Sequence, residues 1–184
     1  MSVKSVIRAL AKKLFGIGPE TNDDLRKRGV RIGENVALVD CAVDYSHGYL
    51  IEIGNDVTMS HVSLLAHDAS VKCPVNKLTY SKIGSIKIGN NVFIGYNSVV
   101  LPGTTIGNNV IIGALSVVKG NIPDNSVMVG NPLEYVCSTE DYMKRNIERF
   151  NKGPVFNTHY PDITKEQIEE MRNALMDGVI GFDL

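Results

Sequence analysis

A repeat of six residues dominates the middle of the chain, from Ile88 to Pro123. An aliphatic residue opens each unit and glycine often follows it, in the series Ile88-Gly89, Ile94-Gly95, Val100-Leu101, Ile106-Gly107, Ile112-Gly113 and Val118-Lys119. Amphipathic helices repeat apolar residues at spacings of three and four and simple strands alternate by two, so neither explains this period. A solenoid of short strands joined by tight turns does explain it. The sequence therefore predicts an all-β solenoid in which the opening aliphatic side chains stack inward.

Composition excludes several classes of function. The 184 residues are enough for one well-buried domain, and the formal net charge of −1 gives no broad basic face for nucleic acid. The scattered cysteines form no CxxC pair, which favours reduced thiols. No apolar run approaches the ~18 residues of a membrane helix, and lysine and arginine interrupt the apolar residues of 1–15. We expect a cytoplasmic protein without nucleic acid partners or stable membrane insertion.

The remaining patterns divide the chain into three parts. Residues 1–31 are expected to form a short amphipathic helix and a lead-in, because apolar residues recur there at helical spacing. Residues 32–136 are the predicted solenoid, in which the repeat breaks after Asp44, restarts at Ile53 and continues inward with Met59 and Leu65. Residues 137–184 are a predicted helical tail, with one helix capped at Ser138 or Thr139 and a second opened by a capping box. Such a tail would cover the open end of the solenoid.

The most suggestive residues for chemistry lie just before a loop. The repeat is lost over residues 71–87, which we predict to form an excursion from the solenoid with a functional role. His67 precedes it, and a neutral imidazole can take a proton from a hydroxyl or an amine. Asp68 follows as a second catalytic candidate, although adjacent residues of a strand point to opposite faces. The alternative is an ordinary surface histidine beside a turn aspartate.

Histidines on neighbouring coils also raise the question of a metal. His47, His61 and His67 are these residues, and imidazole is a common metal ligand. A spacing of six places His61 and His67 on different faces of a three-faced solenoid, which disfavours one shared ion within a subunit. A site between subunits stays open. We expect no metal.

Several motifs resemble those of the hexapeptide-repeat acyltransferases. They are Leu50-Ile51-Glu52-Ile53-Gly54, Leu65-Ala66-His67-Asp68, Val92-Phe93-Ile94-Gly95, Leu101-Pro102-Gly103, and Asn121-Ile122-Pro123 leading to Gly130-Asn131-Pro132. More narrowly, the chain resembles the branch with maltose, galactoside and virginiamycin acetyltransferases and polysaccharide O-acetyltransferases. The resemblance runs from about Ile32 to Val136. It implies a left-handed parallel β-helix that forms a homotrimer and uses acetyl-CoA as acyl donor.

The resemblance also implies roles for particular residues. His67 matches the general base that deprotonates the acceptor, which then attacks the thioester directly. Acceptor contacts are implied for Asp44, His47 and Tyr80. The cofactor would run along a groove past four further positions, Tyr96, Gly113, Ala114 and Lys119.

The predicted function is that of an acetyl-CoA-dependent O-acetyltransferase. Its acceptor would be a sugar or a sugar nucleotide, modified on a hydroxyl during capsule or lipopolysaccharide synthesis. An N-acetyltransferase of a nucleotide-linked amino sugar is an alternative that uses the same His67. Two others are a metal-dependent enzyme like the γ-type carbonic anhydrases and an inactive trimeric scaffold.

Overall fold

The computed structural model describes residues 20–73, 78–158 and 162–183, and these fall into two units that meet between Cys137 and Ser138. The predicted N-terminal helix, within residues 1–15, lies outside the described residues. Helix α2 (Asn22–Lys27), which lies in the predicted lead-in, begins with a capping box between Thr21 and Asp24 and buries Leu25. No helix among the described residues is long and apolar enough to cross a bilayer.

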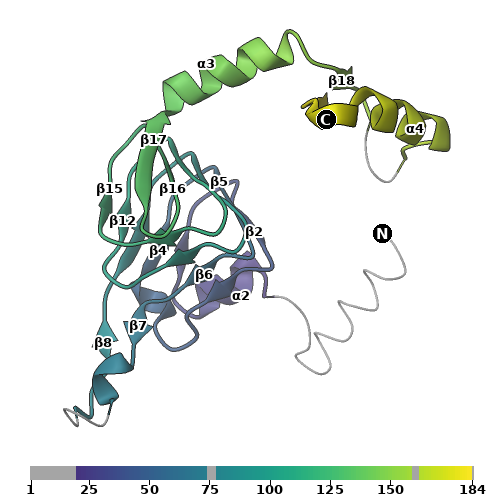
Figure 1. Cartoon of the computed structure of the whole chain (residues 1–184). Helices are drawn as coiled ribbons and strands as arrows, with labels where there is room; N and C mark the ends of the chain where they lie inside the picture. Colours follow the sequence, from purple (N-terminus) through teal and green to yellow (C-terminus); the bar gives the residue numbers. More distant parts are fainter. Residues whose placement is uncertain (1–19, 74–77, 159–161, 184) are drawn as a thin grey trace. The chain divides into compact units, whose positions relative to one another are not determined.

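Three large sheets form the walls of the first unit among its described residues (Figure 1). Sheet A contains β1 (Arg31–Ile32), β4 (Ile51–Ile53), β9 (Ile86–Ile88), β12 (Thr105–Ile106) and β15 (Asn121–Ile122). Sheet B contains β2 (Ala37–Val39), β5 (Val57–Ser60), β10 (Val92–Ile94), β13 (Val110–Ile112), β16 (Ser126–Val129) and β17 (Glu134–Ser138). Sheet C contains β3 (Ala42–Val43), β6 (Ser63–Leu64), β11 (Val99–Val100) and β14 (Val117–Val118).

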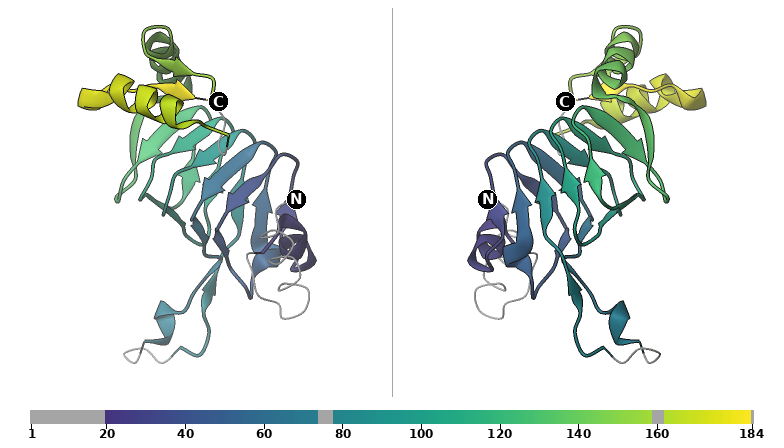
Figure 2. Two further views of the ribbon diagram at one scale, coloured as in Figure 1. Left: turned by 90° about the vertical axis from the view of Figure 1, so that its right-hand side faces the viewer. Right: turned by 90° about the vertical axis from the view of Figure 1, so that its left-hand side faces the viewer.

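Apart from β7 and β8, consecutive strands from β1 to β16 visit the three sheets in turn, so the chain winds as a solenoid (Figure 2). Neighbouring coils pair in parallel, with Ile53 opposite Ile88 in sheet A, Met59 opposite Ile94 in sheet B and Leu64 opposite Val100 in sheet C. Each coil therefore places one aliphatic side chain of each sheet above its counterpart. This arrangement of parallel sheets confirms the predicted solenoid.

The inward residues form one continuous core. The aliphatic residues that open the six-residue units are all buried, namely Ile88, Ile94, Val100, Ile106, Ile112 and Val118. One predicted inward residue was wrong, because Leu64 is fully buried whereas Leu65 is 38% exposed. The first two coils have one residue fewer between sheets B and C, since Met59 and Leu64 occupy the places of Ile94 and Val100. That deletion shifts every following side chain by one position.

The corner between sheets A and B holds a ladder of asparagine and aspartate side chains. Asn35, Asp56, Asn91, Asn109 and Asn125 all adopt positive φ there, which these residue types tolerate better than most. Side-chain hydrogen bonds link Asn35 to Asp56, and they link Asn91 to Asn109 and Asn109 to Asn125, each of the last two at 2.9 Å. Glycine serves close approach at this corner, since a Cβ on Gly89 would lie 2.5 Å from the Gly107 carbonyl oxygen.

Removing one inward side chain should destabilise the solenoid strongly. Ile94 is fully buried between Met59 and Ile112, so we expect Ile94→Ala to lower the free energy of unfolding by about 2–5 kcal/mol. Urea unfolding at one fixed protein concentration measures this change. Lys87→Ala, an exposed position on β9, is the matched control and should change stability by less than about 0.5 kcal/mol. A similarly small change for Ile94→Ala would contradict the stacked core.

The corner between sheets C and A carries the excursion. It leaves through β7 (His67–Asp68) and η2 (Ser70–Lys72) and returns through β8 (Lys82–Ile83), which pairs antiparallel with β7. Figures 1 and 2 show this arm projecting from the solenoid. The predicted boundary of 71–87 was shifted, because His67 already belongs to the arm and Ile86–Ile88 forms the buried strand β9. The arm and the earlier break at Gly48–Leu50 (η1) share this corner on adjacent coils.

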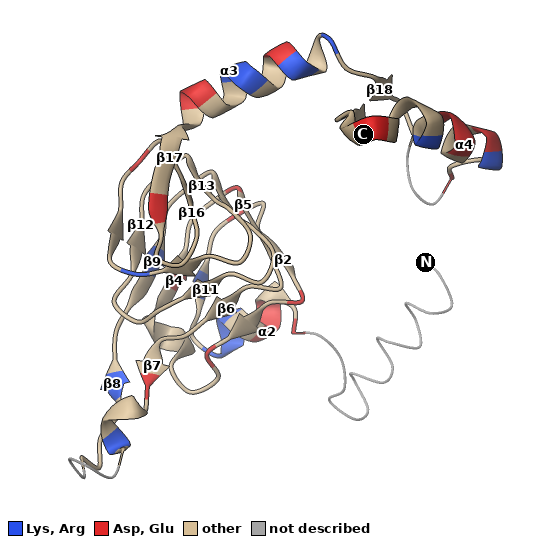
Figure 3. Ribbon diagram, viewed as in Figure 1, with Lys and Arg blue, Asp and Glu red and all other residues tan. Residues whose placement is uncertain are grey.

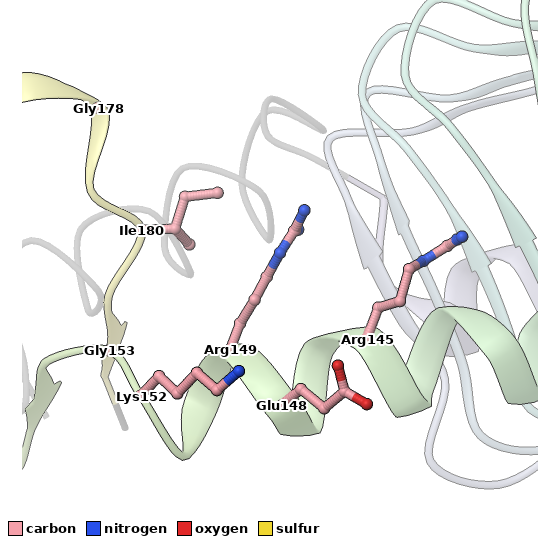
Figure 4. Close-up of a pocket in the computed structure, with 7 residues that line it drawn as sticks. All are labelled: Arg145, Glu148, Arg149, Lys152, Gly153, Gly178 and Ile180. Atoms are coloured by element: carbon pink, nitrogen blue, oxygen red, sulfur yellow. The ribbon is translucent and has the colours of Figure 1, made fainter.

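The described residues of the second unit form two α-helices, a short 3₁₀ helix and a two-stranded sheet. They are α3 (Thr139–Phe150), β18 (Val155–Phe156), α4 (Lys165–Ala174), η3 (Met176–Gly178) and β19 (Phe182–Asp183). The predicted caps are present, with Ser138 at the start of α3 and a Thr164–Gln167 capping box on α4. Basic and acidic side chains follow one another along α3 (Figure 3). A pocket of about 440 Å³ lies where α3 ends, lined by Arg145, Glu148, Arg149, Lys152, Gly153, Gly178 and Ile180 (Figure 4).

Candidate active site

A second cavity, of about 780 Å³, lies at the corner between sheets C and A. Successive coils contribute to it, because His67 follows β6, Pro102 follows β11 and Lys119 follows β14. Its lining is Leu65, His67, Asp68, Ala69, Lys82, Ile83, Gly84, Leu101, Pro102, Gly103 and Lys119. The described residues that line the pocket at the end of α3 include no histidine and no cysteine, so the corner cavity is the better candidate for chemistry.

Asp44 and His67 form the central contact of this corner. Val43 pairs with Leu64 across β3 and β6, so the chain segments that leave these two strands lie next to each other. His67 Nδ1 is 2.5 Å from Asp44 Oδ2, and the same oxygen accepts a hydrogen bond from the Ala66 N–H at 2.9 Å. The Asp44 side chain is fully buried, whereas that of His67 is 39% exposed. The Nδ1 side of the His67 imidazole is thus fixed by Asp44, and the rest of the ring is open to the cavity.

The electrostatics of Asp44 set the protonation pattern of this pair. Burial raises the pKa of the Asp44 carboxyl, but hydrogen bonds from His67 and from the backbone N–H groups of His47 and Ala66 outweigh burial and leave the pKa lowered. Asp44 is therefore ionised at neutral pH and acts as an acceptor only. The proton between the two groups accordingly resides on His67 Nδ1. Nε2 is then the ring nitrogen that can accept a proton.

The segment around Asp44 is built locally as an Asx turn. Asp44 Oδ1 accepts hydrogen bonds from the backbone N–H groups of Ser46 at 3.1 Å and His47 at 3.0 Å, just before η1. Arg28 braces the segment by donating to the carbonyl oxygens of Val43 and Asp44, both at 3.3 Å. These contacts explain why the repeat breaks here. They also hold the carboxylate in place for His67.

Asp68 does not pair with His67. Its carboxylate contacts Lys82 Nζ at 2.5 Å across the β7–β8 pair and accepts a hydrogen bond from the Ser70 N–H at 2.7 Å. The Lys82 ammonium is the main cause of a lowered pKa for Asp68. Asp68 lines the cavity, but the carboxylate beside the imidazole is Asp44, which the sequence had suggested only as an acceptor contact.

The other two described histidines lie at different corners of the solenoid. His47 lies beside His67, with ring centroids 5.1 Å apart, and its Nδ1 is 3.5 Å from Asp44 Oδ1. His61 lies at the corner between sheets B and C instead, where its ring centroid is 4.6 Å from that of Tyr96 and the two rings are tilted by 40°. The expected separation of His61 from His67 is therefore present. The histidine that does lie beside His67 is His47, which comes from the break in the repeat.

The remaining predicted site residues occupy several positions. Lys119 lines the cavity with His67. Tyr80 lies on the excursion, is 80% exposed and does not line the cavity. Tyr96, Gly113 and Ala114 belong to the corner between sheets B and C, where the Leu115 N–H donates to the Tyr96 carbonyl oxygen at 2.9 Å. One chain thus brings Lys119, but not these three residues, to the candidate base.

Comparison with known proteins agrees with this architecture. Residues 85–120 match the family described as bacterial transferase hexapeptide (six repeats). Protein CapG of Staphylococcus aureus is 44% identical over 134 residues, which cover 70% of this chain and 77% of CapG. The chain belongs to the hexapeptide-repeat transferase family. Several further relatives of this transferase are named putative acetyltransferases, and the predicted enzyme class, an acetyltransferase, is confirmed.

Solved structures of the same fold include named acetyltransferases. A maltose O-acetyltransferase from Clostridium difficile 630 is 28% identical, with a TM-score of 0.55 over 74% of this chain and 89% of that chain. A galactoside acetyltransferase in complex with coenzyme A is 23% identical, with a TM-score of 0.51 over 87% of this chain and 88% of that chain. The second likeness concerns the fold alone.

Proposed function

We propose that this hexapeptide transferase moves an acetyl group from acetyl-CoA to a sugar hydroxyl, with His67 as general base and Asp44 as its orienting carboxylate. The observation that carries the proposal is the 2.5 Å contact between His67 Nδ1 and Asp44 Oδ2 beside the corner cavity. The similarity to a maltose O-acetyltransferase supports the sugar acceptor. The pathway we propose is surface polysaccharide synthesis, as the motifs of the family branch imply.

The chemistry follows from the pair. His67 Nε2 takes the proton of the acceptor hydroxyl while its oxygen attacks the thioester carbonyl carbon. When the tetrahedral intermediate collapses, the imidazolium returns the proton to the leaving thiolate of CoA. The ionised Asp44 stabilises the imidazolium between these two steps. No cysteine is found among the described residues that line the cavity, which supports direct attack over a covalent acyl-enzyme.

We also propose that the solenoid is left-handed and that the site is completed in a homotrimer. Tyr96, Gly113 and Ala114 lie at a different corner from His67 within one chain, and Tyr96 is half exposed. A neighbouring subunit could bring that corner to the cavity of the first. Sedimentation equilibrium at the concentration used for the activity assay tests the homotrimer, and a monomer with full activity would refute the shared site.

An acceptor panel tests the function itself. The wild-type protein is incubated with acetyl-CoA and neutral sugars, amino sugars and sugar nucleotides, and each product is analysed by mass and by sensitivity to mild alkaline ester hydrolysis. We expect an alkali-labile acetyl ester on a sugar hydroxyl. An alkali-stable amide on an amino sugar would favour the N-acetyltransferase alternative. Absence of CoA release with every acceptor would reject the proposal.

Lys119 is expected to hold the donor. Lys119 lines the cavity and forms no ion pair among the described residues. Lys82, the other lysine of the described lining, is paired with Asp68. A charge-assisted contact to a CoA phosphate would be worth about 1.5–3 kcal/mol, so Lys119→Ala should raise KM for acetyl-CoA about tenfold or more with kcat little changed. Steady-state kinetics measure this, with Lys87→Ala as control. An unchanged KM would remove Lys119 from the donor site.

A further inference from the structure

Asp44 stands between two imidazoles. His67 Nδ1 is 2.5 Å from Oδ2 and His47 Nδ1 is 3.5 Å from Oδ1. One possible ligand atom from each of the three residues lies within 4.8 Å of the others. The set comprises two nitrogens and one carboxylate, which is a donor set that suits zinc and similar transition metals.

His47 has an unused polar atom at this place. Among the described residues its Nδ1 is buried and makes no hydrogen bond. The nearby Asp44 Oδ1 already accepts the N–H groups of Ser46 and His47, and at 3.5 Å the ring nitrogen is too far for a good hydrogen bond. A buried polar atom without a partner is unfavourable. A ligand at this point would satisfy it.

We infer that Asp44, His47 and His67 form a binding site for a divalent transition metal such as Zn²⁺, and that the bound ion inhibits the enzyme. Tetrahedral zinc has Zn–N bonds of about 2.0–2.1 Å and Zn–O bonds of about 2.0–2.2 Å, so its ligand atoms lie about 3.3–3.5 Å apart. The distance from His47 Nδ1 to Asp44 Oδ1 already fits. His67 would move from Oδ2 by about 1 Å, which its partly exposed ring allows.

Inhibition follows from the tautomer of His67 and rests on the proposed function. A metal ion at Nδ1 replaces the proton that Asp44 holds there. The neutral imidazole then carries its proton on Nε2, so Nε2 is a donor and can no longer accept the proton of a hydroxyl. The ion also neutralises the Asp44 charge that would stabilise an imidazolium. One zinc ion per chain is therefore sufficient to stop the base.

Equilibrium dialysis against Zn²⁺ tests the site directly. The protein is untagged and carries Cys73→Ser, so that neither a histidine tag nor the exposed thiol binds zinc. We expect one ion per chain in this background and in His61→Gln, a matched histidine at another corner. His47→Gln should lower the affinity for zinc by at least about 100-fold. Removing a residue that only hydrogen-bonds to a metal ligand lowers metal affinity by about 10- to 100-fold, so the loss of a ligand itself should reach or exceed the upper value. Thermal unfolding without metal verifies that each variant is folded.

The outcomes separate the metal site from the acetyltransferase. Equal zinc affinity in the background and in His47→Gln would overturn the site, whatever the activity. Zinc binding that depends on His47, in a protein inactive toward every acceptor, would leave the site standing and reject the proposed function. With an active enzyme, zinc should inhibit the background and His61→Gln alike, and His47→Gln should need at least about 100-fold more zinc for the same fractional inhibition. Equal inhibition of all three would overturn the inference.

Discussion

Replacing His67 by alanine is expected to lower kcat for acetyl transfer by about 10²–10⁴ and to leave the fold intact. The side chain is 39% exposed and lies outside the inward stack, so its loss creates no cavity in the core. The acceptor hydroxyl would lose its proton acceptor, while donor binding through other residues continues. Thiol release with saturating substrates measures kcat, and urea unfolding measures stability.

The matched control for this change is His61→Ala. His61 is also a partly exposed histidine near a carboxylate, with Nε2 3.9 Å from Asp40 Oδ2, but it lies at the corner between sheets B and C. Its loss should leave kcat within about threefold of wild type if the enzyme uses only His67 as base. A fall of less than about threefold for His67→Ala would remove His67 from the mechanism.

Asp44→Asn is expected to reduce kcat by about 10³, close to the effect of His67→Ala. An asparagine has nearly the same shape and keeps an oxygen for the Ser46 and His47 N–H groups. It carries no charge for an imidazolium, and its amide N–H₂ can donate to His67 Nδ1 and so place the ring proton on Nε2. Asp68→Asn is the control, because its carboxylate pairs with Lys82 and should affect kcat far less.

The contribution of the Asp44 carboxylate to the free energy of unfolding should depend on pH. The pKa of Asp44 is lowered in the folded chain relative to an unfolded aspartate, so ionised Asp44 stabilises the fold above the ordinary range near pH 3.9. This contribution is lost as the pH falls through the folded-state pKa. The difference in unfolding free energy between wild type and Asp44→Asn should therefore be largest near neutral pH and shrink in acid. A difference that grows as the pH falls would contradict the lowered pKa.

The sequence was sufficient for the solenoid because its signal is local and repeated. Ile88, Ile94 and Ile106 recur at a fixed spacing, and each is buried where its period predicts. The excursion was also predictable, since the six-residue period is lost after Ser70, although the buried strand β9 resumes at Ile86, before the predicted end of the excursion. The starts of the two tail helices could be predicted from the N-caps Ser138 and Thr164, because an N-cap depends on neighbouring residues only.

The pairing within the site could not be predicted in the same way. Asp44 meets His67 because β3 and β6 pair with Val43 opposite Leu64, and that register depends on the short spacing between sheets B and C in the first two coils. Reading Leu65 as inward hid this register. The break at Asp44 was a usable signal, since an aspartate followed by Ser46 and His47 is typical of an Asx turn, but nothing local shows which coil it faces.

The most direct test of the catalytic pair is a double-mutant cycle on acetyl transfer. Initial rates are measured for wild type, His67→Ala, Asp44→Asn and the double variant with acetyl-CoA and the preferred sugar. Because Asp44 acts through His67, we predict that the double variant is no slower than His67→Ala, a strongly non-additive result. Two losses that multiply in the double variant would mean that the two residues act independently, and the pair would not be the catalytic unit of this enzyme.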